Sequence, residues 1–474
     1  MTSTKNLVAA TIATALIVAI SAFSLTGSEL PREAGLTLVI FVLAVWAWIF
    51  TPLADVYVAL AAACSLVVFS VIDSEDLAES LGNETIWLLF AAVVMAEGIS
   101  RSGLSSRIVA TLITRARTFT GLFWMITLAL MCTAFLVPST SGRAALALPL
   151  LASLHEALGR RERLTRALSL LIPSVILISA VSSYIGAGAH LITDQILDAN
   201  DLETIGFLRW MILGSGLGLV ASALTCALVM GIFLDREERK ESLQLTAADI
   251  DAPTGEFSAA EQRVLTIVIA AVVGWCTESI HGVEPAIIAV LGALAITAPG
   301  VAGLTLTDGL KKAPWPLLVF MAATLALGKA LVESGAAEWL GEALFAPLQG
   351  WGDIAQWGFL LVLIAVSTYA HLMIQSRSAR SAVLIPLVLT AATSLGVNPV
   401  AAAFASTAAA GFCHTLTSSA KPVALFSQVE DLPGYSAADL LKLSLWLGPA
   451  HGVLVAIFTV SVWPLLGMPF FASA

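Results

Sequence analysis

Long apolar stretches, separated by short polar loops, run along nearly the whole chain. Most of them hold about 17 to 25 residues, the length that a helix needs to cross a hydrocarbon core about 30 Å thick. The pattern therefore predicts an all-α integral membrane protein with about eleven transmembrane helices. We place these helices near residues 7–26, 35–50, 54–72, 85–100, 167–187, 206–233, 263–280, 284–300, 315–332, 397–415 and 441–466.

Two further apolar stretches, near residues 120–157 and 355–395, are each interrupted at the middle by a polar hexapeptide. The hexapeptides read PSTSGR at 138–143 and QSRSAR at 375–380. Four positions carry the same residue at identical offsets, namely Ser139, Ser141, Arg143 and Pro149 in the first stretch and Ser376, Ser378, Arg380 and Pro386 in the second. Because charge at membrane depth is costly, this repeat of buried polar residues is a candidate functional site.

Loop charges indicate how the two stretches are inserted, since cytoplasmic loops carry an excess of lysine and arginine. The loops separate cleanly by charge if both stretches are re-entrant hairpins, the first entering from the cytoplasm and the second from outside. The predicted inner loops then hold Arg101, Arg107, Arg115, Arg117, Arg160, Arg161, Arg163, Arg166, Arg236, Arg239, Lys240, Lys311 and Lys312. The acidic residues Asp73, Glu75, Asp76, Glu79, Asp194, Asp198, Asp201, Glu203, Glu278, Glu284, Glu333, Glu338 and Glu342 fall outside. This arrangement puts the N-terminus in and the C-terminus out.

The chain also divides into two similar halves. Residues 87–103 resemble residues 315–335, and both segments begin with tryptophan and end in Ser-Gly. Opposite hairpin entry together with repeated sequence is typical of inverted-topology repeats in secondary transporters. We therefore predict N-terminal scaffold helices at 1–84, a first inverted repeat at 85–234, a cytoplasmic linker at 235–262 and a second inverted repeat at 263–474.

Composition narrows the class of protein. With 58% hydrophobic and only 12% charged residues, the chain is not a soluble globule, and we expect a multi-pass protein of the plasma (inner) membrane. The net charge of −10 is spread over loops, so no nucleic-acid partner is expected. The five cysteines lie singly inside apolar runs, which predicts no metal site and no cofactor. Neither a phosphate-binding loop nor an enzyme motif such as HExxH or GxSxG occurs, so a membrane-embedded enzyme is only a remote alternative.

The hexapeptides predict an anion site. At each tip a second helical arm begins, and its free N–H groups and positive dipole end favour an anion. The residues at these positions are Ser139, Thr140 and Ser141 in the first tip and Ser376, Arg377 and Ser378 in the second. The alternative is that these serines only cap helices or allow close packing.

A second interruption follows each tip by about 45 residues, at 182–190, which includes Gly188, and at 414–422, which includes Ser419. Such broken helices expose chain ends to a bound ion. The tips and interruptions carry the cations Arg143, Arg377, Arg380 and Lys421 and the possible cationic histidines His190 and His414, with no carboxylate in the same motifs. A bound anion would supply the missing counter-charge, whereas Arg143 and Arg380 have the alternative of capping carbonyls or snorkelling.

These motifs resemble those of the divalent-anion/sodium symporter (DASS) family of dicarboxylate, citrate and sulfate transporters. That family carries Ser-Asn-Thr at each tip, ten residues before a proline, where this chain has Ser139-Thr140-Ser141 before Pro149 and Ser376-Arg377-Ser378 before Pro386. The family's Thr-Pro-Pro-Asn segments align with residues 187–190 and 420–423. The resemblance implies an elevator-type carrier of small divalent anions, most simply di- or tricarboxylates, that forms a homodimer in the lipid bilayer.

The chain departs from the family pattern where that pattern binds sodium. Arg377 stands at one tip-asparagine position, His190 at a break-asparagine position and Lys421 beside the other. A fixed cation about 4 Å from sodium would cost several kcal/mol, so these charges disfavour a sodium site in the second half and replace the ion's charge. We therefore expect sodium-independent anion exchange, with sodium-coupled di/tricarboxylate or sulfate symport as the alternative. Protonation of His190 or His414 is a further route to coupling.

Overall fold

The computed structural model describes residues 30–246, 248–250, 255–345, 352–427, 429 and 432–471. The helix expected near 7–26 lies outside these residues. Within them the chain is helical, with two isolated β-bridges. Eight helical segments of the described part are long and apolar enough to span a membrane: Arg32–Phe50, Ser74–Arg101, Glu162–Ser182, Phe207–Phe233, Ala259–Cys276, Trp315–Glu333, Asp353–Leu372 and Ala437–Val462. The all-helical membrane architecture is confirmed, while the exact helix count and the sidedness stay predictions.

Two series of helices follow each other in the same order. The first comprises α2 (Arg32–Phe50), α3 (Asp55–Val68), α4 (Ser74–Ser80), α5 (Glu84–Arg101), α6 (Leu104–Ile113), α7 (Phe119–Thr133), α8 (Thr140–Ala157), α9 (Glu162–Ser179), α10 (Gly188–Asp198) and α11 (Phe207–Phe233). The second comprises α13 (Ala259–Cys276), α15 (Pro285–Thr297), α16 (Leu306–Lys311), α17 (Trp315–Glu333), α18 (Ala336–Phe345), α19 (Asp353–Tyr369), α20 (Arg377–Ser394), α21 (Pro399–Ala409), α22 (Lys421–Ser427) and α23 (Ala437–Ile457). Short helices α12 (Arg236–Lys240) and α14 (Glu278–His281) have no counterpart in this correspondence.

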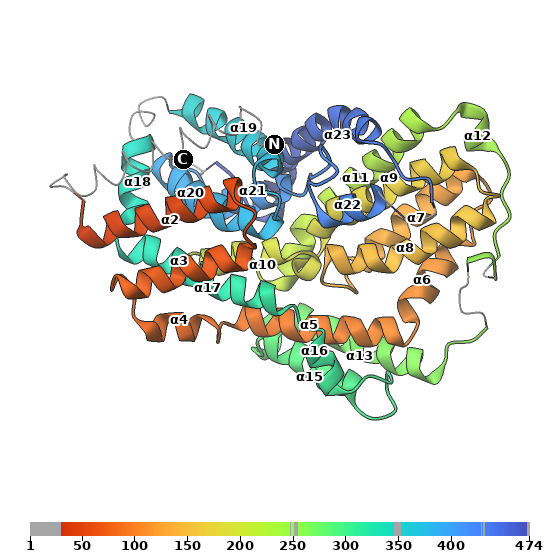
Figure 1. The fold of residues 1–474 in the computed structure, drawn as a ribbon, viewed down its shortest axis with the longest axis horizontal. Helices are drawn as coiled ribbons and strands as arrows, with labels where there is room; N and C mark the ends of the chain where they lie inside the picture. Colours follow the sequence, from red (N-terminus) through yellow and green to blue (C-terminus); the bar gives the residue numbers. More distant parts are fainter. Residues whose placement is uncertain are drawn as a thin grey trace.

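Packing follows the same correspondence. Helix α3 of the first series packs on α17 of the second, and α15 of the second packs on α5 of the first. In the first series α9 contacts both α7 and α8, and in the second α21 contacts both α19 and α20. Figure 1 shows α7, α8 and α9 on one side of the molecule and α19, α20 and α21 on the other, with α10 and α22 between them.

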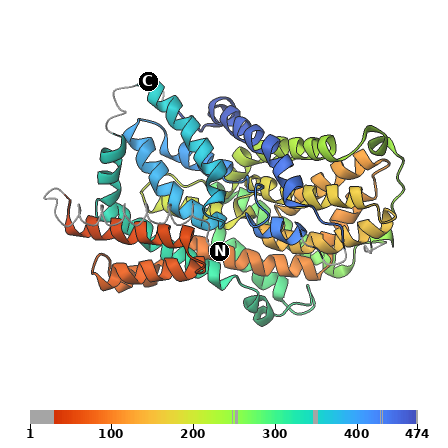
Figure 2. The same ribbon diagram turned by 45° about the horizontal axis from the view of Figure 1, so that its top comes forward.

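The helices that lie between these two groups, α10 and α22, each pack on a helix of the other series. Helix α10 packs on α20, and α22 packs on α8. Figure 2, turned by 45°, shows the same interleaving of the two halves. Each hexapeptide tip therefore belongs to one series, while one of the helices packed beside its second arm comes from the other series.

A matched pair of glycines supports the correspondence at the level of single residues. Helix α5 is followed by Gly103 and α17 by Gly335, with φ angles of 81° and 76°. Glycine adopts this left-handed conformation without the steric cost that other residues incur, and it commonly follows the end of a helix. The Ser-Gly ends recognised in the sequence are thus the same turn in both halves.

Both helices that precede the second interruptions end earlier than the apolar pattern predicts. The span expected at 167–187 ends its α-helix at Ser179 and continues as two short 3₁₀ turns, and the span expected at 397–415 ends at Ala409. Residues Ser183 and Ala187 have extended backbone. Hydropathy alone does not detect these ends because the non-helical residues around them are buried as deeply as the helix.

The linker between the halves is bound to basic residues of the first half. The Arg107 side chain donates to Glu261 at 2.6 Å and to the Gly255 carbonyl at 2.8 Å. Arg161 donates to both carboxylate oxygens of Glu241, and this hydrogen bonding holds the pKa of Glu241 below its usual range. The acidic linker residues thus lie at the same end of the molecule as arginines of the predicted inner loops.

Buried apolar residues form two cores, and the two hexapeptide segments belong to different ones. Helices α19 and α20 contribute to a core that also contains α2, α3, α5, α15 and α17. Helices α7 and α8 pack in the second core with α9, α22 and the first part of α23. The two tips, although similar in sequence, are therefore held by different surroundings.

Candidate functional site

The second tip begins α20 and presents Arg377. Ser376 caps the helix, its hydroxyl accepting a hydrogen bond from the Ala379 N–H at 3.2 Å. Arg377, the first helical residue, is only partly buried and makes two long contacts, to the Leu177 carbonyl at 3.4 Å and to His190 at 3.5 Å. Its Nε–H is buried without a hydrogen-bond partner. This guanidinium therefore keeps donors free for a ligand.

Both interruptions approach this tip. Ser378 lies beside Gly188, since a Cβ built on Gly188 would be 3.3 Å from the Ser378 hydroxyl. A Cβ built on Gly411, after the end of α21, would be 3.4 Å from Arg377 Nη2. Glycine at these two positions allows the backbone of each interruption to come close to the tip.

His190 is fully buried where α10 meets the second tip. Its Nδ1 lies 3.0 Å from the Ser183 carbonyl, and its ring stacks on Trp210 with centroids 4.9 Å apart. A carbonyl only accepts, so Nδ1 carries the proton and Nε2 presents a lone pair to Arg377. The structure thus brings Arg377 of the second tip against His190 of the first interruption.

Arg380 lies one turn further along α20 and is completely buried. It donates to the Ala410 carbonyl at 3.3 Å and to Cys413 Sγ at 2.7 Å, which ties α20 to the end of α21. Its Nε–H has no partner. Arg380 therefore holds the chain between the end of α21 and the interruption at 414–422 in place, and its Nε–H remains unpaired.

The first tip is organised differently, although it starts with the same cap. Ser139 accepts from the Gly142 N–H at 3.2 Å and begins α8. Arg143, 1% exposed, donates four hydrogen bonds to the carbonyls of Leu130 and Ile176 and the hydroxyls of Thr133 and Ser179. These acceptors lie near the C-terminal ends of α7 and α9, where the helix dipole favours a cation. The geometry favours a positioning role for Arg143, and its contact with substrate stays a prediction.

The remaining predicted site residues make fewer contacts with the tips. Thr140 is half-buried and Ser141 exposed at the start of α8. The buried Ser419 hydroxyl accepts from the Leu416 N–H at 2.9 Å and closes a turn in the second interruption. Lys421 begins α22 with an exposed side chain, and within the described part of the chain no hydrogen bond joins it to the Arg377 site. The assignment of Lys421 to the charged site stays a prediction.

A group of three buried histidines, His371, His414 and His451, surrounds Phe412 with ring centroids 5.1 to 6.4 Å from it. His371 Nε2 contacts the Thr415 hydroxyl, and Nε2 of His414 and Nδ1 of His451 are buried without partners. His371 and His451 are 80 residues apart along the chain, so their shared neighbour Phe412 does not follow from the sequence pattern. No group of histidine, cysteine or carboxylate side chains suited to a metal occurs among the described residues.

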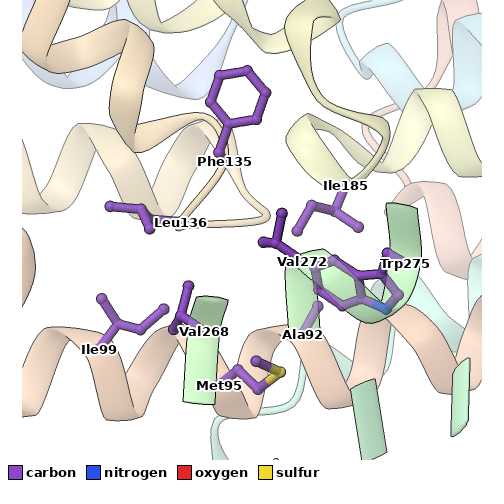
Figure 3. A pocket seen from close by; sticks show the side chains of 9 residues that line it. All are labelled: Ala92, Met95, Ile99, Phe135, Leu136, Ile185, Val268, Val272 and Trp275. Atoms are coloured by element: carbon purple, nitrogen blue, oxygen red, sulfur yellow. The ribbon is translucent and has the colours of Figure 1, made fainter. Parts of the chain in front are cut away.

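A small pocket near the first tip is apolar. Phe135 and Leu136, which precede the hexapeptide, and Ile185 of the first interruption face α5 and α13 across it (Figure 3). The other lining residues are Ala92, Met95, Ile99, Val268, Val272 and Trp275. Such a lining offers almost no donors to an anion, so the polar groups around Arg377 are the better anion site.

The distribution of charged side chains also favours the surroundings of Arg377 as the anion site. The ion pairs of the described residues all join loop, linker or helix-end groups, and none includes Arg143, Arg377 or Arg380. Three buried or half-buried guanidinium groups thus share the region of the tips and interruptions without a carboxylate within ion-pairing distance. Unpaired cations in a low-dielectric interior favour the binding of an anion.

Solved structures share the fold. The Alcanivorax borkumensis YdaH transporter aligns with a TM-score of 0.56 at 17% identity, covering 93% of this chain and 100% of that one. Neisseria gonorrhoeae MtrF, described as an antimetabolite efflux pump, aligns with a TM-score of 0.58 at 14% identity, covering 96% and 99%. At these identities the likeness establishes the fold alone.

Two of the sequence relatives are named as dicarboxylate transporters. Dicarboxylate transporter 1 from Arabidopsis thaliana chloroplasts is 24% identical over 81% of this chain and 68% of its own length. The sodium-dependent dicarboxylate transporter SdcS of Staphylococcus aureus is 23% identical over 92% of this chain and 88% of its own. A Cupriavidus necator membrane protein is 23% identical, and the match spans only 62% of that protein.

The family model described as the sodium:sulfate symporter transmembrane region matches residues 3–472. This match covers almost the whole chain and confirms the resemblance stated from the tip and interruption motifs. The chain is a multi-pass membrane transporter and not an enzyme, and it belongs to the sodium:sulfate symporter (DASS) family.

Proposed function

We propose that the protein is a secondary active transporter that exchanges small divalent anions, most simply di- or tricarboxylates, across the membrane. The observation that carries this proposal is Arg377, a half-buried cation without a carboxylate partner whose Nε–H is free. Gly411 lies beside its guanidinium, and the hydroxyl of the next residue, Ser378, lies against Gly188. A small dianion fits this combination because guanidinium groups bind carboxylates with two parallel hydrogen bonds.

The relatives support the class of substrate. Two of them are named as dicarboxylate transporters, and the family model is named for sulfate. Dicarboxylates and sulfate share two negative charges and several acceptor oxygens, so one guanidinium and nearby hydroxyls suit both. We place dicarboxylates first because relatives aligned over most of the chain carry that name.

Built-in cations favour exchange without sodium. Arg143 donates to four oxygens near the ends of α7 and α9, and Arg380 donates to a carbonyl at the end of α21. Carbonyl and hydroxyl oxygens of this kind are ligands that a small cation would use. A sodium ion about 4 Å from a guanidinium would be repelled by about 4 kcal/mol at an effective dielectric near 20.

A second candidate function is sodium-coupled symport. It is favoured by the relative named a sodium-dependent transporter and by the first tip, where Thr140 rather than an arginine occupies the middle of the triplet. Sodium in the first half alone would therefore meet less repulsion than in the second. The two candidates differ in whether transport needs a sodium gradient or an anion on the opposite side.

The wider architecture belongs to the same proposal. The matched series α2–α11 and α13–α23 and their exchanged packing support two inverted repeats, with the hexapeptide segments as re-entrant hairpins. In this arrangement α2 and α13 correspond, so the first repeat would include the N-terminal helices from Arg32. Elevator movement of the tips past α5 and α13, and assembly as a homodimer, complete the proposal.

The test is uptake of labelled succinate into proteoliposomes that contain the purified protein. Internal unlabelled succinate should accelerate uptake strongly, and replacing sodium by choline should leave the rate unchanged. Malate, citrate, 2-oxoglutarate and sulfate compete in the same assay and rank the substrates. Uptake that needs an inward sodium gradient and ignores internal anion would establish symport instead.

A matched pair of variants separates binding from folding. Arg377→Ala should abolish most exchange, while Arg163→Ala removes a cation that pairs with Asp235 at the surface and should leave exchange nearly unchanged. Unchanged exchange in Arg377→Ala would place the anion elsewhere.

A further inference from the structure

The contact between His190 and Arg377 has a defined proton arrangement. Nδ1 of His190 donates to the Ser183 carbonyl, so the neutral ring offers its Nε2 lone pair to Arg377 Nη2 at 3.5 Å. Trp210 stacks on the ring and limits its rotation. The neutral imidazole is therefore the form that matches the structure without a ligand.

Protonation of this ring changes the contact from attractive to repulsive. A proton on Nε2 would point an N–H at the N–H groups of Arg377, and two cations would lie side by side in a buried position. A dianion that accepts from both groups removes this conflict, because each of its charges then faces one cation. The guanidinium alone, in contrast, leaves a dianion with one negative charge unbalanced.

Other ionisable groups around the pair come from several elements. Arg377 reaches His190 from α20, and Tyr184 of the first interruption donates to Asp194 on the His190 helix at 2.7 Å. His414 after α21, His451 on α23 and Arg143 on α8 lie within electrostatic reach of Arg377, and Arg380 follows it on α20. Among these groups His190 is the one whose lone pair faces the guanidinium.

We propose that His190 is a proton-binding site of the transporter and that the dianion and one proton bind together between His190 and Arg377. This inference rests on the proposed function, since it assigns the coupling of that same anion site. Loading takes up a proton and release returns it, so binding changes the net charge of the site by one unit instead of the two that the dianion alone would bring. Dianion affinity should accordingly rise as the pH falls.

The first experiment measures the half-saturating concentration of fumarate for exchange at several pH values. Fumarate remains a dianion from about pH 6 to pH 8, so its own ionisation does not contribute. One proton taken up per anion predicts a decrease of up to about tenfold in that concentration for each unit of pH lowered, in the range where histidine titrates. His190→Gln, which keeps a polar side chain but does not titrate, should show weaker binding that no longer changes with pH.

His451→Gln is the matched control. It removes another buried histidine that faces Arg377, yet its Nε2 contacts the Ala408 carbonyl and not the proposed site. The pH dependence should remain in this variant. If it disappears in His451→Gln and remains in His190→Gln, the assignment of the proton to His190 is wrong.

The second experiment needs no variant. Calorimetry of fumarate binding to the wild-type protein, in two buffers of different ionisation enthalpy, counts the protons taken up and should give a value near one. A value near zero overturns the inference even where exchange is normal. The absence of fumarate, succinate and sulfate exchange at every pH would instead refute the proposed function.

Discussion

The two tips have the same cap and the same arginine offset, yet they use their arginines differently. At the first tip Arg143 donates four hydrogen bonds to neutral oxygens of α7 and α9. At the second, Arg380 makes two contacts and Arg377 makes two long ones, and each keeps a buried Nε–H without a partner. The number of N–H donors that a buried arginine leaves without a partner therefore indicates whether it supports the fold or can bind a ligand. By that criterion we propose that the first tip is a framework and the second a binding site.

The largest expected effect is on folding, from Arg143→Ala. Removal of the guanidinium leaves two carbonyls and two hydroxyls buried with fewer donors, which should cost about 3 to 5 kcal/mol of stability. Thermal unfolding in detergent should show a midpoint several degrees lower, and Arg143→Lys should recover only part of it. If Arg143→Ala is as stable as wild type but fails to bind anion, the two tips do not differ as described.

The next effect is on binding, from Arg377→Ala. Because its contacts are few and long, the variant should keep nearly the wild-type unfolding midpoint. Loss of a charge-assisted hydrogen bond to the anion should weaken succinate binding by about 30- to 100-fold, equivalent to about 2 to 3 kcal/mol. Calorimetry with the purified protein measures this affinity. A large loss of stability with unchanged affinity would reverse the roles assigned to the two tips.

Arg380→Ala should fall between these two variants. Its guanidinium supports the Ala410 carbonyl and Cys413 at the second interruption, so a loss of about 1 to 2 kcal/mol is expected. Anion affinity should fall less than in Arg377→Ala. Thermal unfolding and succinate calorimetry on the same preparation give both values, and equal losses of affinity in Arg377→Ala and Arg380→Ala would indicate that both guanidinium groups bind the anion.

The smallest effect comes from a pair of glycines. A Cβ at Gly188 would lie 3.1 Å from Leu317 and 3.3 Å from Ser378, whereas a Cβ at Gly142 would have its nearest neighbours at 3.4 to 3.7 Å. Gly188→Ala should therefore displace the second tip and weaken exchange about 3- to 10-fold, while Gly142→Ala stays within about twofold. Exchange rates in proteoliposomes decide this. Equal tolerance at both glycines would mean that the second tip is no more closely fitted than the first.

The sequence predicted the elements better than their contacts. Hydropathy located most of the helices, and the matched offsets of serine, arginine and proline identified the corresponding tips. The different tasks of Arg143 and Arg377 were not visible, because the acceptors of Arg143 lie 10 to 36 residues away along the chain and are mostly ordinary backbone or hydroxyl groups. The family resemblance alone assigns Lys421 to the same site as Arg377. No sequence motif indicates that the Lys421 side chain is exposed.

The crossing of α10 onto α20 has a consequence for biosynthesis. Helix α10 is buried along almost its whole length, and its main packing partner, α20, ends at residue 394. At synthesis rates of about 5 to 20 residues per second, the ribosome needs roughly 10 to 40 s to make the roughly 200 residues that separate the ends of the two helices. During that interval α10, which contains Asp194 and Gln195, has to remain in or beside the insertion machinery without α20 to pack against. We therefore expect the nascent first half to become resistant to quality-control proteases only when the second half is complete.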